Sequence, residues 1–197
     1  MTDLATLGQY KGMGPTAVPF DPGQSASPLT PTFRELFEDE FSYVCQTVRR
    51  LGVREHDIED VAHDVFVVVH RKLAEFDPRM RVRPWLFGIA FRAVAAYRRR
   101  RKYRNEAGDE PEPIHAGPYA DEEIEKKQRN EVLYRVLDSM HPDRRAVFVM
   151  HSIDGHTIPE IASSLEIPVN TAYSRLRLAR EEFALSAKNL VPERGGV

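Results

Sequence analysis

The sequence predicts an all-α fold, with two small helical bundles joined by a flexible acidic linker and a helix-turn-helix in the second bundle. Apolar residues recur at helical spacing in both halves of the 197-residue chain, and no stretch has the two-residue period of a strand. Between the halves, residues 105–121 are rich in proline, glycine and acidic residues. An apolar fraction of 42% supports small cores and not one large core. We therefore expect separate helical domains at residues 32–104 and 122–187.

Both ends of the chain are expected to be disordered. Residues 1–31 hold five prolines and four glycines with little periodicity, and residues 188–197 form a short tail. The N-terminus lacks a secretory signal, and no apolar run approaches the ~20 residues that span a bilayer, so we expect no membrane insertion. The single cysteine, Cys45, excludes an internal disulfide, is expected in the core, and fits a reducing, cytoplasmic location.

Two helices are expected at the start of the first domain. Apolar residues follow helical spacing over residues 33–48, and Gly52 marks the end of that helix. The second helix is expected over about residues 55–76. Its Val65–Val69 run alone would suit a strand, but the long helical period on both sides outweighs this.

A basic segment with interleaved aromatic residues follows. A loop opens at Asp77–Pro78, and Pro84 suits the first turn of a third helix. Residues 79–104 contain ten Lys or Arg residues and no acidic one, and six of the ten lie in residues 98–104. Arginine neutralises phosphates and aromatic rings stack on unpaired bases, which indicates a nucleic-acid surface. Residues 106–125 then hold eight acidic residues and no Lys or Arg, so the net charge of −2 masks strong segregation.

The second domain is expected to begin with two helices and to continue into a helix-turn-helix. Pro142 starts the second of these helices. Thr157 caps the next helix, with Glu160 completing a capping box, and Ile167–Pro168 ends it because proline disfavours a helical residue before it. The first helix is marked by Val132, Leu133, Val136, Leu137 and Met140, and the second carries Ala146, Val147, Met150 and His151. The apolar stripe of the helix that Thr157 caps is Ile158, Ile161, Ala162 and Leu165.

The last helix, over about residues 169–183, has a polar face suited to a DNA major groove. We expect it to bury Val169, Ala172, Leu176 and Ala179. Its exposed side chains reach phosphates and base edges; they are Asn170, Tyr173, Ser174, Arg175, Arg177 and Arg180. The alternative is an ordinary helical hairpin with a solvated basic face. The coincidence of cap, turn, apolar spacing and basic face favours DNA binding.

An acidic stripe follows the second helix. Asp57, Asp60 and Asp64 fall at positions i, i+3 and i+7 on one side, with Glu59 and His63 nearby. The stripe indicates either a solvated face or a docking surface for a basic protein partner.

The same stretch admits an enzymatic alternative. His56–Asp57 and His63–Asp64 are His-Asp doublets of the kind found in metal-dependent phosphohydrolases, and His70 follows at the same spacing. Residues seven apart lie about 10 Å apart along a helix, which is too far for one ion with bonds near 2 Å. A site using His63 with Asp60 or Asp64 remains sterically possible. We predict no catalytic residue, no cofactor and no metal site.

Both halves together resemble bacterial sigma factors of the extracytoplasmic-function (ECF) group within the sigma-70 family. The resemblance covers roughly residues 33–185. In the first half it lies in Asp57–Phe66, Phe76–Pro78 and Pro84–Ala90, and in the second half in Leu137–Pro142, Ile158–Ala162 and Ile167–Leu176. Each motif is moderately specific, and their order and spacing across an acidic linker make the resemblance strong.

The resemblance implies a promoter-specificity subunit that binds core RNA polymerase and directs transcription initiation. Its implied polymerase-binding residues are Asp57, Glu59, Asp60, His63 and Asp64. Its implied contacts to the melted −10 promoter element are Asp77, Arg79, Arg81, Arg83, Arg92, Arg98 and Arg99. Its implied contacts to the duplex −35 element are Asn170, Thr171, Tyr173, Ser174, Arg175, Arg177 and Arg180. The linker would lie in the RNA exit path, and an anti-sigma factor is an implied partner.

Four positions depart from the family pattern. His63 stands where glutamine is frequent, and Arg92 stands where asparagine is common. Glu166 replaces the frequent turn glycine, and Tyr173 replaces a frequent Lys or Arg, which implies an unusual −35 preference or weaker −35 binding. Two other functions compete with the sigma-factor prediction: a stand-alone helix-turn-helix regulator, which leaves residues 79–104 unexplained, and the metal-dependent hydrolase.

Overall fold

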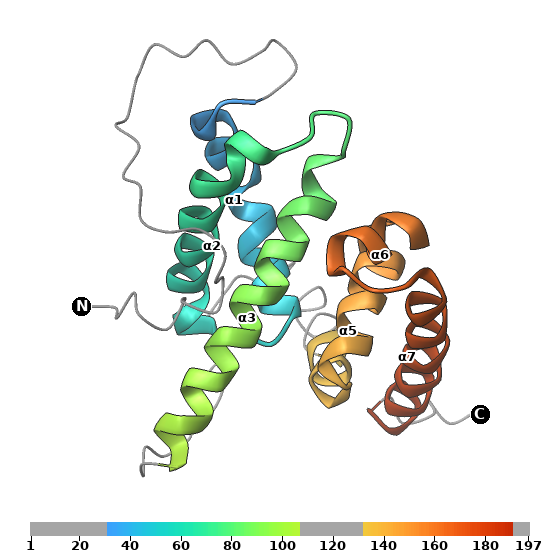
Figure 1. Cartoon of the computed structure of the whole chain (residues 1–197). Helices are drawn as coiled ribbons and strands as arrows, with labels where there is room; N and C mark the ends of the chain where they lie inside the picture. Colours follow the sequence, from blue (N-terminus) through green and yellow to red (C-terminus); the bar gives the residue numbers. More distant parts are fainter. Residues whose placement is uncertain (1–30, 107–131, 191–197) are drawn as a thin grey trace, which may run out of the picture.

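The computed structural model describes residues 31–106 and 132–190, and within these ranges the fold is helical with no strand. Figure 1 shows a group formed by α1, α2 and α3 beside a group formed by α5, α6 and α7. The helices are α1 (Phe33–Arg50), α2 (Ile58–Lys72), α3 (Val82–Glu106), an unlabelled helix over residues 132–139, α5 (Pro142–Phe148), α6 (Ile158–Leu165) and α7 (Val169–Leu190). Single 3₁₀ turns, Glu55–Asp57 and Leu73–Glu75, flank α2, and a π-helical turn, Val149–Ile153, follows α5.

Local sequence signals set the ends of α1. Thr32 and Glu35 form a capping box, in which the Glu35 carboxylate accepts from the Thr32 backbone amide at 2.7 Å. The helix ends at Arg50 with Leu51 as its C-cap, and Gly52 follows with a φ of +96°, a left-handed conformation that favours glycine. The predicted end at Gly52 is therefore confirmed.

The three helices of the first half pack against one another. Val65, Phe66 and Val69 are buried on α2, so the helical interpretation of the valine-rich run is confirmed and the strand alternative is wrong. The third helix starts two residues before Pro84 and continues through Glu106. It therefore extends past the predicted domain end at residue 104, while the remainder of the predicted linker lies outside the described residues.

The helix-turn-helix forms as predicted, with two differences. Thr157 and Glu160 make the predicted capping box of α6. At the other end of α6, Glu166 adopts a left-handed φ of 56°. The last helix runs to Leu190 and not to about residue 183. Val169 is 44% exposed, so its predicted burial is wrong; it lies in the first turn of α7, where no preceding turn covers it.

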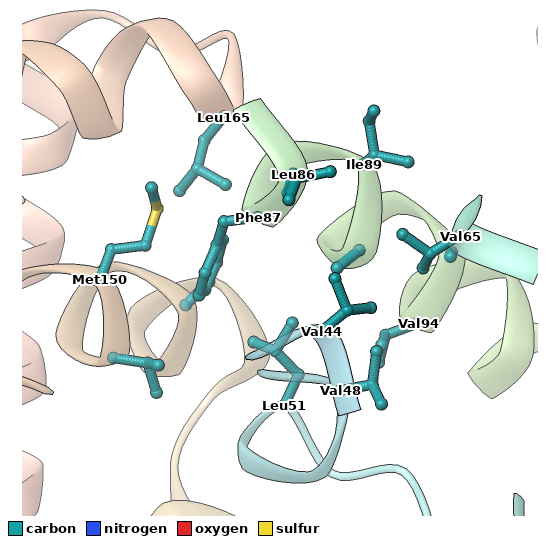
Figure 2. Packing of buried hydrophobic residues seen from close by; sticks show 14 of the residues in the cluster. Val44, Val48, Leu51, Val65, Leu86, Phe87, Ile89, Val94, Met150 and Leu165 are labelled. Carbon is teal, nitrogen blue, oxygen red and sulfur yellow. The ribbon is translucent and has the colours of Figure 1, made fainter. Parts of the chain in front are cut away.

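The two halves share one continuous apolar cluster. Figure 2 shows Leu51 and Phe87 of the first half beside Met150 and Leu165 of the second. Leu51, Phe87 and Met150 are almost completely buried. The expectation that each half buries only its own small core is thus corrected, because α6 packs directly on α3. None of the described helices is both long and apolar enough to cross a membrane.

The buried histidine His156 makes the stability of the packed halves depend on pH. His156 is 2% exposed, and burial lowers its pKa below the ordinary value of 6.5, although Asp154 and Glu160 favour its charged form; Arg81 and Arg83 also lower it. Below that ordinary value the unfolded chain takes up a proton that the folded chain resists, so the free energy of unfolding falls as the pH falls.

We predict that His156→Leu removes this contribution. Thermal unfolding measured from about pH 7.5 to about pH 5.5 should show a smaller loss of Tm in His156→Leu than in the unchanged chain. The exposed His70→Leu is the matched control and should keep the original pH dependence. An equal loss of Tm in all three proteins would contradict the role of His156.

Candidate nucleic-acid and protein interfaces

The first turns of α7 present a polar surface to solvent. The exposed residues are Asn170, Tyr173, Ser174, Arg177 and Arg180. Tyr173, the aromatic residue among these five, is 58% exposed. Thr171 is half-buried, and its carbonyl oxygen accepts from Ser174 Oγ at 2.9 Å. The helix therefore displays, on one segment, most of the residues predicted to contact duplex DNA.

Two arginines of α7 already have carboxylate partners. Arg175 is half-buried, and its Nη2 donates to Asp143 of α5 at 2.7 Å. Arg177 pairs with Glu181 one turn along α7, also at 2.7 Å. The ion pair to α5 fixes the guanidinium of Arg175 beside the exposed segment, whereas the pair of Arg177 is largely solvated.

The loop before α3 carries an exposed ion pair. Arg79 donates to Asp77 through its backbone amide at 3.0 Å and through its guanidinium at 2.8 Å. These hydrogen bonds lower the pKa of Asp77 to about 2. Asp77 therefore shapes the loop, and Arg79 projects from it with its side chain 90% exposed.

The other predicted −10 residues, Arg81 directly before α3 and four arginines on α3, fall into two groups. Arg81 pairs with Glu160 at 3.5 Å and Arg92 with Glu166 at 3.1 Å, so both contact the helix-turn-helix half. The second group stays within the first half. Arg83 pairs with Glu40 at 3.0 Å and lies over the Tyr43 ring. Arg98 donates to the Leu51 carbonyl, and Arg99 is exposed. Burial lowers the pKa of Arg98.

A cavity of about 150 Å³ lies where α3 meets α6. It is lined by Met80, Trp85 and Arg92 from the first half and by Ser163 and Glu166 from the second, among others. Trp85 is half-buried, and its ring packs on that of Phe76 with 4.8 Å between centroids. Periodicity within either half contains no signal for this cavity, because its walls come from segments about 80 residues apart.

The acidic stripe on α2 is divided between two environments. Asp57 accepts from the hydroxyl of Tyr97 at 2.7 Å, and Asp64 pairs with Arg100 at 3.2 Å, so both carboxylates brace α2 against α3. The exposed members are Glu59, Asp60 and His63. The structure thus places four of the five predicted residues on α2 and Asp57 in the turn before it, and it leaves only three of the five exposed.

The described residues contain no group of three or more His, Cys, Asp or Glu side chains that could hold a metal ion. His63 Nδ1 lies 2.7 Å from the Glu59 carbonyl oxygen, and the His70 ring packs edge-on against Phe33 at 5.0 Å. This geometry gives the metal-dependent hydrolase alternative no support.

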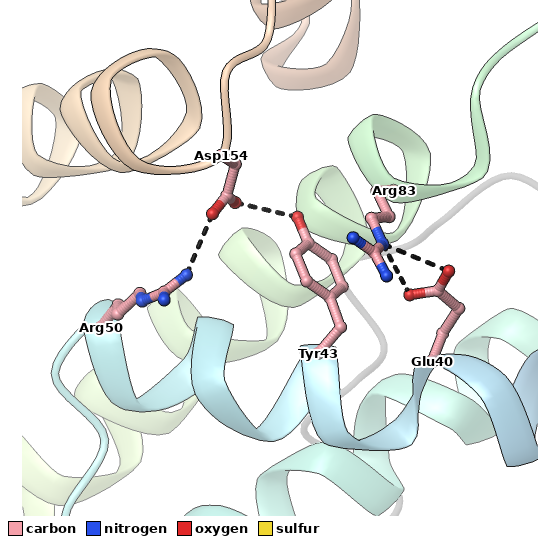
Figure 3. A network of polar contacts seen from close by, with 5 residues as sticks. All are labelled: Glu40, Tyr43, Arg50, Arg83 and Asp154. Carbon is pink, nitrogen blue, oxygen red and sulfur yellow. Dashed lines mark hydrogen bonds and ion pairs between the residues drawn. The ribbon is translucent and has the colours of Figure 1, made fainter.

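Sequence reasoning missed a polar network between the halves. Asp154, just before α6, accepts from the Tyr43 hydroxyl and from Arg50, each at 3.0 Å (Figure 3). Burial raises the pKa of Asp154, and the two donors oppose that rise. Close by, the buried Arg145 donates to the Arg50 carbonyl and pairs with Asp138 at 2.8 Å. A lone Asp before a helix reads as a turn residue, so no local pattern could identify these partners.

Two protein-family profiles match the chain. The profile for sigma-70 region 2 matches residues 36–104, and the profile for sigma-70, region 4, matches residues 130–183. The first therefore covers the group of α1, α2 and α3, and the second covers the helix-turn-helix half.

Known proteins with the same organisation resemble the chain along most of its length. The RNA polymerase sigma factor CnrH of Cupriavidus metallidurans is 30% identical over 82% of this chain and 89% of its own length. The ECF RNA polymerase sigma factor RpoE of Cereibacter sphaeroides is 30% identical over 77% of this chain and 83% of its own.

Solved structures agree with these likenesses. CnrH in complex with the cytosolic domain of CnrY superposes with a TM-score of 0.55 at 27% identity, covering 78% of this chain and 85% of that one. RpoE in complex with the anti-sigma factor NepR from Bartonella quintana superposes with a TM-score of 0.64 at 18% identity, covering 79% and 96%, and shows the likeness in fold. The exposed helix-turn-helix, the arginine-rich α3 and the matches to both sigma-70 regions lead to one conclusion: the chain belongs to the ECF RNA polymerase sigma factors and initiates transcription from promoter DNA as a non-enzymatic subunit.

Proposed function

We propose that this sigma factor divides its contacts between two halves. Residues 32–104 bind core RNA polymerase and the melted −10 element, and residues 122–187 bind the duplex −35 element, with the acidic segment at residues 105–121 as the linker. The observation that carries this division is that one chain presents both an exposed acidic segment on α2 and an exposed polar segment on α7. Run-off transcription with purified core polymerase and genomic promoter fragments tests it; promoter-dependent transcripts are expected, and a stand-alone regulator would give none.

We place polymerase docking on Glu59, Asp60 and His63, with Asp57 and Asp64 as the residues that hold α2 in position. The first three are exposed, whereas Asp57 and Asp64 have partners on α3. Complementary charge steers association with a basic surface, and juxtaposed like charges oppose it.

We predict that the double variant Glu59→Lys/Asp60→Lys stays helical but loses co-purification with core polymerase. Like-charge contacts at an interface cost several kcal/mol, which is about a hundredfold or more in affinity. The matched control is Glu38→Lys/Asp39→Lys, which makes the same charge change at exposed positions of α1. Retention of polymerase by the α2 variant, or equal loss in both variants, would remove the docking assignment.

We assign −10 contact to the loop before α3 and to the arginines of α3. Arg79, Arg81 and Arg99 are exposed, and Arg92 lines the cavity beside Trp85. Arg83 pairs with Glu40, and Arg98 donates to the Leu51 carbonyl, so we give these two arginines a positioning role. Asp77 orders the loop through its hydrogen bonds with Arg79.

We predict that Arg81→Ala/Arg92→Ala abolishes open-complex formation without loss of polymerase binding. Removing two phosphate contacts weakens strand capture and lowers the slope of its salt dependence by about 1.4, because each contact to a single strand contributes about 0.7. Permanganate footprinting of the −10 region is the measurement, with polymerase co-purification as the control. Footprints of unchanged strength would show that these two arginines do not contact the melted strand.

For the −35 element we propose that the contacts come from Asn170, Thr171, Tyr173, Ser174, Arg175, Arg177 and Arg180. The Asp143 carboxylate orients Arg175 toward the groove, and Arg180 lies about three turns into α7, where it contacts phosphate. A bidentate Arg–guanine pair discriminates between bases by about 1–3 kcal/mol, whereas a phosphate contact carries no sequence information.

We predict different consequences for two arginines of α7. Arg175→Ala should change the preferred −35 sequence in a randomised-promoter selection, and Asp143→Asn should weaken the same preference because it releases the guanidinium. Arg180→Ala should lower output about equally on all sequences. If Arg175→Ala selects the same promoters as the unchanged chain, Arg175 only positions the helix, and Tyr173 and Arg177 become the candidate base readers.

We also infer that the protein acts in the cytoplasm and that an anti-sigma factor regulates it. The structural relatives include CnrH with the cytosolic domain of CnrY and RpoE with the anti-sigma factor NepR. Affinity purification of the full chain from its host tests this inference. A stoichiometric small partner that is displaced by core polymerase is the expected result, and purification of the chain with polymerase alone would contradict it.

A further inference from the structure

Two exposed apolar side chains lie at the front of α7, which forms the outer edge of the second half (Figure 1). Val169, the first residue of α7, is 44% exposed, and Tyr173, one turn later, is 58% exposed. Residues four positions apart lie on the same face of a helix, so these two side chains form one patch. Among the described residues, the apolar cluster that fills the core includes neither of them.

Folding of the helix-turn-helix gives no reason for this patch. The α7 side chains that enter the core are Ala172, Leu176 and Ala179, and they are buried on another face of the helix. Ile167, in the turn before α7, also packs against the core. Valine and tyrosine are weaker helix formers than alanine or leucine, so helix propensity does not favour them at exposed positions. The patch is therefore available for a contact outside the chain.

The charges around the patch indicate which part of a DNA duplex it suits. Residues 169–174 contain no charged side chain. The first exposed arginine of α7, Arg177, lies one turn past Tyr173 and pairs with Glu181 at 2.7 Å. A phosphate contact needs a cation or a hydrogen-bond donor, and the Val169 side chain offers neither. The patch therefore suits a base edge better than the phosphate backbone.

Thymine is the base that presents an apolar group in the major groove. Its C5-methyl group lies there, and apolar side chains such as phenylalanine contact it. In helix-turn-helix proteins the N-terminal residues of the recognition helix reach the base edges. Val169 is the first residue of that helix, and Tyr173 adds an aromatic ring one turn later. The patch thus has both the chemistry and the position to contact thymine methyl groups.

We propose that Val169 and Tyr173 read thymine methyl groups in the −35 element. The proposal rests on the proposed −35 role of α7 and adds to it the class of base that the helix selects. The two residues are about 6 Å apart along the helix axis, which is close to two base-pair steps of about 3.4 Å each. The two thymines therefore lie within two base pairs of each other.

Replacement of thymine by deoxyuracil tests the proposal, because deoxyuracil lacks only the C5-methyl group and keeps the base pair. The full chain bound to core polymerase is first used to select its preferred −35 sequence from randomised promoters. Each thymine on both strands of that sequence is then replaced singly, and binding of the same complex to the promoter fragment is measured. Two positions, no more than two base pairs apart, should each lose about fourfold in affinity, the loss expected for a buried group of methylene size.

Val169→Ser and Tyr173→Ser connect each loss to one residue of the patch. Each variant should bind the thymine and deoxyuracil forms equally at one of the two positions and keep the discrimination at the other. Both residues are exposed, and surface substitutions of this kind leave the fold nearly unchanged. The matched control is Leu185→Ser, which removes a 66% exposed apolar side chain about three turns further along α7 and should keep the discrimination at both positions.

The outcomes separate methyl reading from the −35 assignment and from a protein contact. A selected −35 sequence that is bound equally with thymine and with deoxyuracil at every position would overturn methyl reading and leave the −35 assignment in place. Discrimination that persists in both Val169→Ser and Tyr173→Ser would also overturn it. Loss of polymerase co-purification in these variants, with discrimination unchanged, would overturn it in favour of a protein contact. Selection of no −35 sequence by the unchanged chain would overturn the −35 assignment itself.

Discussion

The close approach of α6 to α3 at Gly88 is the constraint on which the rest of the closed structure depends. With any side chain at that position, the Ser164 backbone could not reach α3. The approach brings Leu165 and Met150 into the apolar cluster around Phe87 (Figure 2). It also sets the carboxylates of Glu160 and Glu166 within reach of Arg81, directly before α3, and of Arg92 on α3. One missing Cβ therefore links the packing of the halves to the ion pairs between them.

The energies of the contacts between the halves suit a reversible closure. Ion pairs that are largely exposed, such as Arg81–Glu160, contribute about 0–1 kcal/mol each. Apolar burial contributes about 25 cal/mol per Å², so the apolar contact carries most of the stabilisation. Asp154 acts differently. Leaving its buried carboxylate without donors would cost more free energy than the paired arrangement contributes to stability. Tyr43 and Arg50 thus make the register between the halves specific, while the exposed ion pairs add little to its stability.

Sequence alone predicted most helices and the helix-turn-helix because their signals are local. The Thr157–Glu160 capping box and the apolar spacing of α6 lie within a few residues of one another. The contacts between the halves are not local: Tyr43 and Asp154 are 111 positions apart. The same limit applies to the acidic stripe. Helical spacing predicted that Asp57 and Asp64 share one side of the second helix. It could not show that Tyr97 and Arg100 of α3 bind these two carboxylates. The predicted burial of Val169 was wrong because periodicity carries no information about what covers the first turn of a helix.

The distance between the halves in solution tests the closed arrangement most directly. Spin labels at Gln46→Cys on α1 and Leu185→Cys on α7, both exposed sites, would report it by pulsed electron paramagnetic resonance in a Cys45→Ser background. The packing of α6 on α3 predicts one narrow distance distribution for the unchanged chain, and a longer, broader one for Gly88→Ala. A broad distribution in the free chain, indistinguishable from that of Gly88→Ala, would contradict it.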